Sequence, residues 1–105
     1  MAVVRNRSME PTLYDGDRLL VAYRRRPAAG DVVVARFPDG TLVVKRVGDR
    51  EMGREDGGWW LLSDNPDAGV DSRHVGAVRE VLGVAVARLW PHPRMLRRGD
   101  LSTRW

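Results

Sequence analysis

The sequence predicts a single, mainly β domain. Short runs rich in β-branched residues recur along the chain, and a turn signal such as Pro38-Asp39-Gly40 separates each from the next. The chain shows no internal repeat and no alternation of strands with helices. Its 105 residues are enough for one domain with a modest core, and too few for two. We therefore expect one all-β unit.

The expected strands can be placed in order between the turn signals. Turns are predicted at Asp15-Gly16-Asp17, at Gly30-Asp31 and at the hairpin of residues 38–40. Residues 52–58 are polar and Gly-rich, which predicts an exposed loop, and residues 63–76 predict a long turn region. Gly83 favours a strand over a helix in the last apolar run. The strands are expected at residues 3–4, 18–23, 32–35, 41–47, 59–63 and 78–89.

Composition excludes several functional classes. Without cysteine the chain has no disulfide, thiolate metal site or cysteine nucleophile, and His74 and His92 are too few for a convincing metal cluster. No apolar run reaches the roughly 20 residues of a membrane helix, and the amino terminus lacks the apolar core of a signal peptide. We expect a cytoplasmic protein with no cofactor and no membrane segment. The oligomeric state is left open.

The net charge of +4 is concentrated at the end of the chain. Residues 91–105 contribute +3 of it, so residues 1–90 are nearly neutral. A nucleic-acid domain would carry a concentrated basic face, so no nucleic-acid partner is expected. Arg24-Arg25-Arg26 is interpreted as a solvated loop. We expect residues 1–90 to form the single folded domain and residues 91–105, after Pro91-His92-Pro93, to form a mobile basic tail.

Ser8 and Lys45 are the candidate catalytic pair. Lys45 is the only lysine among 18 basic residues, and an ammonium can lose its proton on burial whereas a guanidinium cannot. Period-two alternation puts Lys45 on the strand face of Val43 and Val47, with Arg46 on the opposite face, meeting solvent or a carboxylate. Burial on the valine face would lower the pKa of Lys45. A neutral amine beside Ser8 could accept the hydroxyl proton during attack on a carbonyl.

Donors for the developing oxyanion are expected at the same turn. The backbone N–H of Ser8 is one candidate, and the side chain of Asn6 is the other. A Ser-His-Asp triad with Asp71 and His74, three residues apart, is a weaker alternative, because a triad depends on geometry that spacing alone does not supply.

Four segments stand out in order along the chain. They are Ser8-Met9-Glu10-Pro11-Thr12-Leu13 with Gly16-Asp17; Gly30-Asp31-Val32-Val33; Lys45-Arg46-Val47; and Ser63-Asp64-Asn65-Pro66 with Asp71-Ser72-Arg73-His74-Val75-Gly76. These segments resemble the boxes of signal peptidase I and its relatives. The SOS-response repressors share the same pair and fold, but Asp71-Ser72-Arg73 with Gly76 favours the signal-peptidase branch.

The resemblance implies a coiled β-sheet that forms a partly open barrel, and a serine endopeptidase with a Ser/Lys dyad. Ser8 would be the nucleophile and Lys45 the general base, and the partner would be a precursor protein bound as an extended peptide, with small side chains near the cleaved bond. Support residues near the dyad would be Ser63, Asp64, Asp71 and Arg73.

The sequence departs from the family pattern at three positions. Gly69 stands where a serine that orients the lysine is expected, and Ser63 stands where glycine is usual. Asn6 replaces a serine or glycine two residues before the nucleophile. These departures leave the orientation of Lys45 and the oxyanion donors open, while both dyad members are present.

Two further features narrow the resemblance: no membrane segment stands before Ser8, and the domain ends in Leu89-Trp90-Pro91. In both, the chain is similar to the small nickel-type superoxide dismutase maturation proteases. That resemblance implies removal of a short leader from the dismutase precursor. The alternatives are a signal-peptidase-like protease for another precursor, a truncated membrane-anchored signal peptidase, and a non-catalytic β module that binds extended peptides. Gly69 favours the last of these.

Overall fold

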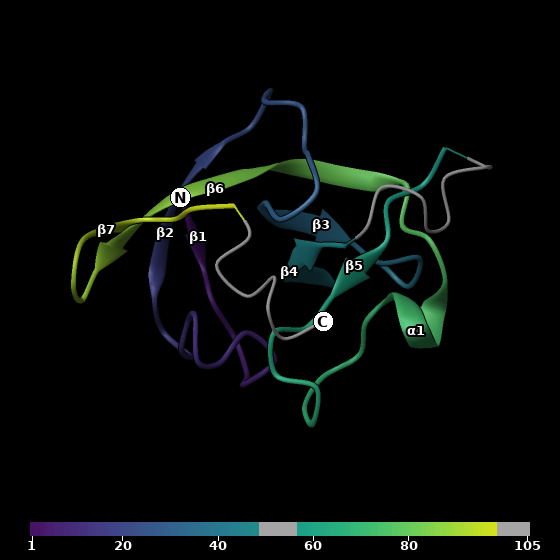
Figure 1. Ribbon diagram of the computed structural model, residues 1–105, viewed down its shortest axis with the longest axis horizontal. Coiled ribbons are helices and arrows are strands. Elements are labelled where there is room, and N and C mark those ends of the chain that lie inside the picture. Colours follow the sequence, from purple (N-terminus) through teal and green to yellow (C-terminus); the bar gives the residue numbers. More distant parts are fainter. Residues whose placement is uncertain (49–56, 99–105) are drawn as a thin grey trace.

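The computed structural model describes residues 1–48 and 57–98 as one antiparallel sheet with a single helical turn (Figure 1). The seven strands run in the order β1-β2-β6-β3-β4-β5, and β7 pairs with β6 beside this path. The sheet is open, with β1 and β5 at its ends. The elements are β1 (Ala2–Val3), β2 (Arg18–Ala22), β3 (Val32–Arg36), β4 (Leu42–Val47), β5 (Leu61–Leu62), α1 (Ser72–Val75), β6 (Glu80–Trp90) and β7 (Arg94–Met95).

The mainly β prediction is confirmed, and each of the six expected strands has a counterpart among β1 to β6. The sheet stays open and does not close into a barrel. Strand β5 is shorter than expected, because Trp59 forms only an isolated bridge with Val78. Most of the loop predicted at residues 52–58 lies outside the described residues. No helix in the described part of the chain is long and apolar enough to cross a membrane.

Gly83 permits the close approach of β2 to β6. A Cβ at this position would lie 2.8 Å from the backbone of both Ala22 and Tyr23, a distance that real Cβ atoms do not adopt. A glycine inside a strand commonly marks such a close backbone approach. The residue that argued against a helix is therefore also one that this sheet needs.

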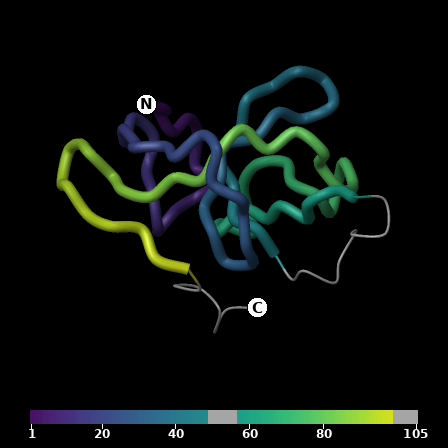
Figure 2. Tube along the Cα trace, turned by 90° about the horizontal axis from the view of Figure 1, so that it is seen from above, coloured from purple at the N-terminus to yellow at the C-terminus, as the bar shows by residue number. Residues whose placement is uncertain are grey.

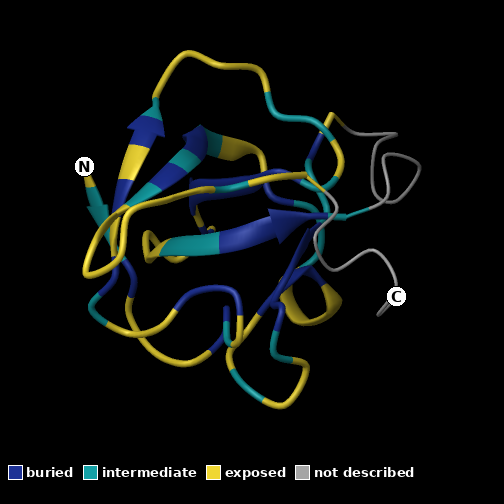
Figure 3. Ribbon diagram, turned by 60° about the vertical axis from the view of Figure 1, so that its left-hand side comes forward, coloured by how far each residue is buried: buried dark blue, intermediate teal, exposed yellow. Residues whose placement is uncertain are grey.

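The core lies on both faces of the sheet, and β3 contributes to both. Val32 and Val34 belong to one buried cluster, whereas Val33 and Ala35 belong to the other. This explains the unbroken apolar run of β3, since a strand buried on both faces has no reason to alternate. The central strands are accordingly mostly buried, whereas most exposed residues lie in the loops (Figure 3). The exposed loops include the basic run at residues 24–26, as expected.

The segment after residue 90 begins with contacts to the domain. Strand β7 pairs with β6, and the backbone N–H of Leu96 donates to the carbonyl of Val86 at 3.0 Å. The guanidinium of Arg94 donates to the carbonyl of Thr12 at 2.7 Å, and Arg98 forms an ion pair with Asp31. Residues 94–98 of the expected tail, which follow the turn between β6 and β7, thus lie against the sheet (Figure 2), and residues 99–105 lie outside the described residues.

Candidate active site

The turn that carries Ser8 is anchored by two buried apolar side chains. Met9 and Leu13 are fully buried in one core cluster, and the backbone N–H of Leu13 donates to the carbonyl of Met9 at 2.9 Å. Both side chains of this turn therefore point to the same part of the core. Ser8, immediately before this turn, lines an open groove at the surface. Core packing therefore determines where the serine is presented.

Asn65 holds the same turn from the opposite side. Its backbone N–H donates to the carbonyl of Ser8 at 2.8 Å, and its side-chain amide donates to the carbonyl of Arg7 at 3.1 Å. Asn65 belongs to the last conserved box but was not among the predicted site residues. Its position before Pro66 was the available signal, because an extended residue there can turn its backbone and side chain toward a neighbouring loop.

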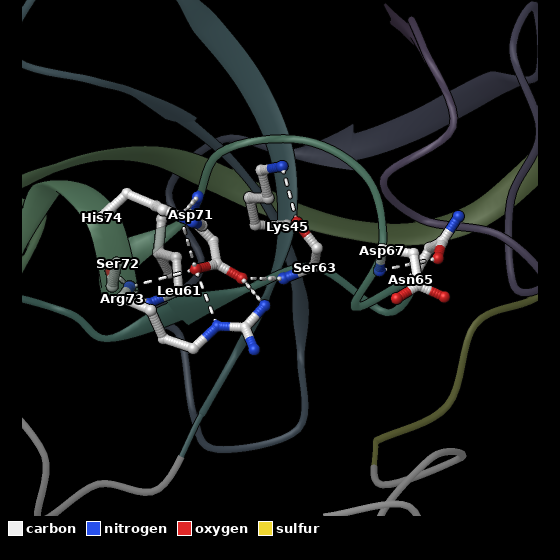
Figure 4. Close-up of polar contacts among 9 residues, drawn as sticks. All are labelled: Lys45, Leu61, Ser63, Asn65, Asp67, Asp71, Ser72, Arg73 and His74. Atoms are coloured by element: carbon white, nitrogen blue, oxygen red, sulfur yellow. Dashed lines mark hydrogen bonds and ion pairs between the residues drawn. The ribbon is translucent and has the colours of Figure 1, made fainter.

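Lys45 lies on the buried valine face of β4, as the alternation predicts. It is paired in register with Val33, and only 3% of its surface is exposed. Burial lowers the pKa of Lys45 from its usual value of 10.5, and the carboxylate of Asp71 opposes this shift in part. The Nζ atom donates to Ser63 Oγ at 3.0 Å (Figure 4).

Gly69 brings Ser8 and Lys45 together. A Cβ built on Gly69 would lie 2.6 Å from Ser8 Cβ and 3.2 Å from Lys45 Nζ, so the backbone of this loop lies against both residues. Gly69 also has a φ of +81°, which favours glycine. Ser8 and Lys45 form no hydrogen bond with each other in the described part of the chain. Such bonds are often long in substrate-free enzymes and shorten only when substrate binds.

Asp71 supports this region from the start of α1. One oxygen accepts from the backbone N–H of Ser63 at 3.0 Å, and both oxygens accept from the guanidinium of Arg73. Burial by itself raises the pKa of Asp71, but hydrogen bonds from Arg73 and from the Ser63 backbone outweigh it and lower the pKa. Asp71 thus stays ionised and holds the segment on which Ser63 lies (Figure 4).

Arg46 and Asp64 form a buried ion pair directly beside the candidate dyad. Two guanidinium nitrogens of Arg46 donate to the two oxygens of Asp64, at 3.0 and 2.8 Å, and neither side chain is more than 1% exposed. Thr12 Oγ1 also donates to Asp64 at 2.6 Å. Arg46 was expected to face either solvent or a carboxylate, and its guanidinium pairs with the carboxylate of Asp64. Three segments, the Ser8 turn, β4 and the loop after β5, are joined by this network.

His74 is committed to the cap of α1. The backbone N–H of Asp71 donates to His74 Nδ1 at 3.2 Å, and the Asp71 side chain accepts from the first turn in return. This reciprocal pair is a capping box. The side chain of His74 is 55% exposed, and it has no contact with Ser8 among the described hydrogen bonds. The arrangement gives no support to a Ser-His-Asp triad.

An open groove of about 830 Å³ runs past Ser8, Lys45 and Gly69. Residues of β1 line one side, and residues of β4 with the hairpin before it line the other. Both strands present an unpaired edge to the groove. Strand β1 is the terminal strand of the sheet. The earlier part of β4 lacks a partner on its outer side, because β5 pairs only with Arg46 and Val47 in the described part of the chain. Its lining is mostly apolar or uncharged. A volume in this range is typical of ligand-binding pockets.

Changing Asp71 to asparagine should lower the pKa of Lys45 further, because the carboxylate is the charge that raises it. In a cleavage assay the rate should then begin to rise at lower pH, since the neutral amine forms at lower pH. Asparagine keeps only one of the two acceptor oxygens and loses the charge that pairs with Arg73, so the change should also cost about 1–3 kcal/mol of unfolding free energy.

Asp67→Asn is the matched control for this change. It removes one carboxylate from an exposed position in the same loop, and the pH profile should remain that of the parent protein. A profile that does not move in Asp71→Asn would contradict the electrostatic link between Asp71 and Lys45.

The mainly β fold, with Ser8 and Lys45 at the same groove, fits a serine peptidase of the type that includes signal peptidases and SOS-response repressors. The family model for Peptidase S24-like proteins matches residues 1–86. The chain belongs to this Peptidase S24-like family and is a serine peptidase. No curated protein matches the chain.

Proposed function

We propose that the chain is an endopeptidase with a Ser8/Lys45 dyad that removes an amino-terminal leader from a precursor protein. One observation carries the proposal: the buried amine of Lys45 and the side chain of Ser8 lie against the same glycine, beside an open groove. Burial lowers the pKa of Lys45, so a neutral amine is accessible closer to neutral pH than for a free lysine.

The chemical steps use these two side chains in turn. Neutral Lys45 accepts the proton of Ser8 Oγ as the oxygen attacks the peptide carbonyl, and the resulting ammonium gives that proton to the leaving amine. The acyl-enzyme is then hydrolysed by a water molecule whose proton Lys45 accepts. As the ester bond breaks, the Lys45 ammonium returns that proton to Ser8 Oγ, which regenerates the hydroxyl and the neutral amine.

Two donors are available for the oxyanion. The backbone N–H of Ser8 and the side-chain amide of Asn6 make no hydrogen bond within the described part of the chain, and both residues line the groove. Asn6 adopts a φ of +70°, in the left-handed region that asparagine tolerates better than most residues. We assign both as donors to the tetrahedral intermediate.

The substrate would bind as an extended strand between β1 and β4. Unpaired strand edges bind a peptide through its backbone, and the side-chain pockets between them then set specificity. Apolar side chains such as Val34, Val44 and Leu82 line the groove, which favours an uncharged segment at the cleavage site.

The nickel-type superoxide dismutase precursor is the first candidate substrate. Support for it comes from the similarity of residues 8–76, and of the Leu89-Trp90-Pro91 ending, to the proteases that mature this dismutase. A signal-peptidase-like protease acting on another precursor is the alternative within the same chemistry. Gly69 no longer favours a non-catalytic module, because Lys45 Nζ donates to another hydroxyl, that of Ser63.

The test is to incubate the purified protein with leader-bearing precursors, the dismutase first, and to read the new amino terminus by intact-mass spectrometry. We expect a single cleavage that releases the leader, and no cleavage by Ser8→Ala. Cleavage by Ser8→Ala at the parent rate would exclude the dyad. Binding of the precursors without cleavage, in the parent and in Ser8→Ala alike, would favour the peptide-binding alternative.

A further inference from the structure

The amine of Lys45 has one hydrogen-bond partner among the described residues, Ser63 Oγ, at 3.0 Å. Both residues are almost fully buried, at 3% and 1% exposure. They lie 18 residues apart, on β4 and directly after β5. We propose that Ser63 positions the Lys45 amine for proton transfer, in the space that Gly69 leaves open. This inference rests on the proposed function.

A lysine amine needs such a partner because its stem is flexible. Four methylene groups separate Nζ from the backbone, and an unheld amine would sample several rotamers. A neutral amine has two N–H donors and one lone pair. When one N–H is fixed on Ser63, rotation of the amine is restricted, and the lone pair can be held toward Ser8 for proton transfer.

Ser63 is itself held in place through its own backbone N–H and through the residues before and after it. Its own N–H donates to Asp71 Oδ2 at 3.0 Å, and the next residue, Asp64, is held by Arg46. The preceding residues Leu61 and Leu62 pair with β4, the strand that carries Lys45. The hydroxyl therefore has little freedom relative to the amine that it accepts from.

Gly69 explains why this task falls to position 63. A Cβ at position 69 would lie 2.6 Å from Ser8 Cβ, 3.2 Å from Lys45 Nζ and 3.5 Å from Ser63 Oγ. Any side chain on this backbone would displace the nucleophile before its functional group reached the amine. Because Gly69 has no side chain, Ser8, Lys45 and Ser63 can all approach the same space beside its Cα. The hydroxyl that meets the amine there comes from Ser63.

Lys45 is the only lysine, which makes a direct test possible without any substrate. Protein grown with ¹³C,¹⁵N-lysine contains one labelled side chain, and its Cε resonance against pH reports the pKa of Lys45. In Ser63→Ala the titration midpoint should move to lower pH, because an acceptor that stabilises the ammonium is lost. With a cleaved precursor, kcat should fall about 10- to 100-fold at little change in KM. Ser63→Thr keeps the hydroxyl and should restore both values.

Ser72→Ala is the matched control. Ser72 is equally buried, and its hydroxyl accepts from the backbone N–H of Leu61 at 2.8 Å without a contact to Lys45. This variant should lose stability as Ser63→Ala does, and keep the parent midpoint and kcat. A cooperative thermal unfolding transition should be measured for each variant, to check that it is folded.

The outcomes separate this inference from the proposed function. A parent midpoint and kcat in Ser63→Ala would overturn the positioning role. Lost activity with an unmoved midpoint and no rescue by Ser63→Thr would also overturn it, since that is the pattern of a structural residue. Parent-level cleavage by Ser8→Ala would instead refute the dyad, while the lysine titration would still decide whether Ser63 acts on Lys45.

Discussion

Replacement of Lys45 by methionine should abolish cleavage and raise the free energy of unfolding at pH 7. Loss of a general base costs about 10²- to 10⁴-fold in rate. The stability gain follows from burial: in the folded state the pKa of Lys45 lies below 10.5, so at lower pH folding must either bury an ammonium or release its proton. Methionine has a similar length and no charge. Urea unfolding and the precursor assay measure the two effects.

The sign of the pH dependence gives a second check. Between the lowered pKa of the folded state and 10.5, the unfolded chain binds more protons at Lys45, so this residue makes the parent protein more stable as pH rises. The advantage of Lys45→Met should therefore shrink toward pH 10.5. Lys45→Arg should be as inactive as Lys45→Met, because a guanidinium keeps its proton. Full activity of Lys45→Arg would exclude the general-base role.

Replacement of Arg46 by alanine should destabilise the fold by about 3–5 kcal/mol. The change leaves the carboxylate of Asp64 buried without its partner, and an unpaired buried charge is one of the most costly lesions in a protein. It also removes the hydrogen bond from Arg46 to the carbonyl of Gly30 at 2.8 Å. Urea unfolding at pH 7 measures the loss.

Arg36→Ala is the matched control for this prediction. Arg36 forms an ion pair with Glu80 at 2.6 Å, but both side chains are about half exposed, and such pairs contribute about 0–1 kcal/mol. Adding Asp64→Asn to Arg46→Ala should recover part of the lost stability, since no unpaired charge then remains. A loss in Arg46→Ala no larger than that in Arg36→Ala would contradict the importance of the buried pair.

The local sequence pattern was sufficient to predict where the strands lie and which face of β4 carries Lys45. Gly and Pro turns delimit the apolar runs, and alternation puts Lys45 with Val43 and Val47 without any knowledge of the partner strands. Strand β7 could not be predicted, because Arg94–Met95 has no apolar pattern and becomes a strand only by pairing with β6. The limits of β5 depend in the same way on the strand beside it.

The sequence by itself determined the chemical candidates: one lysine among arginines, a serine in a turn, and the order of the boxes around them. Only the tertiary structure decided how they are held. Burial of Arg46 depends on a sheet with cores on both faces, and the partner of the Lys45 amine is a serine 18 residues away. Periodicity reports which side of a strand a residue occupies, whereas the groups that meet it there are set by long-range packing.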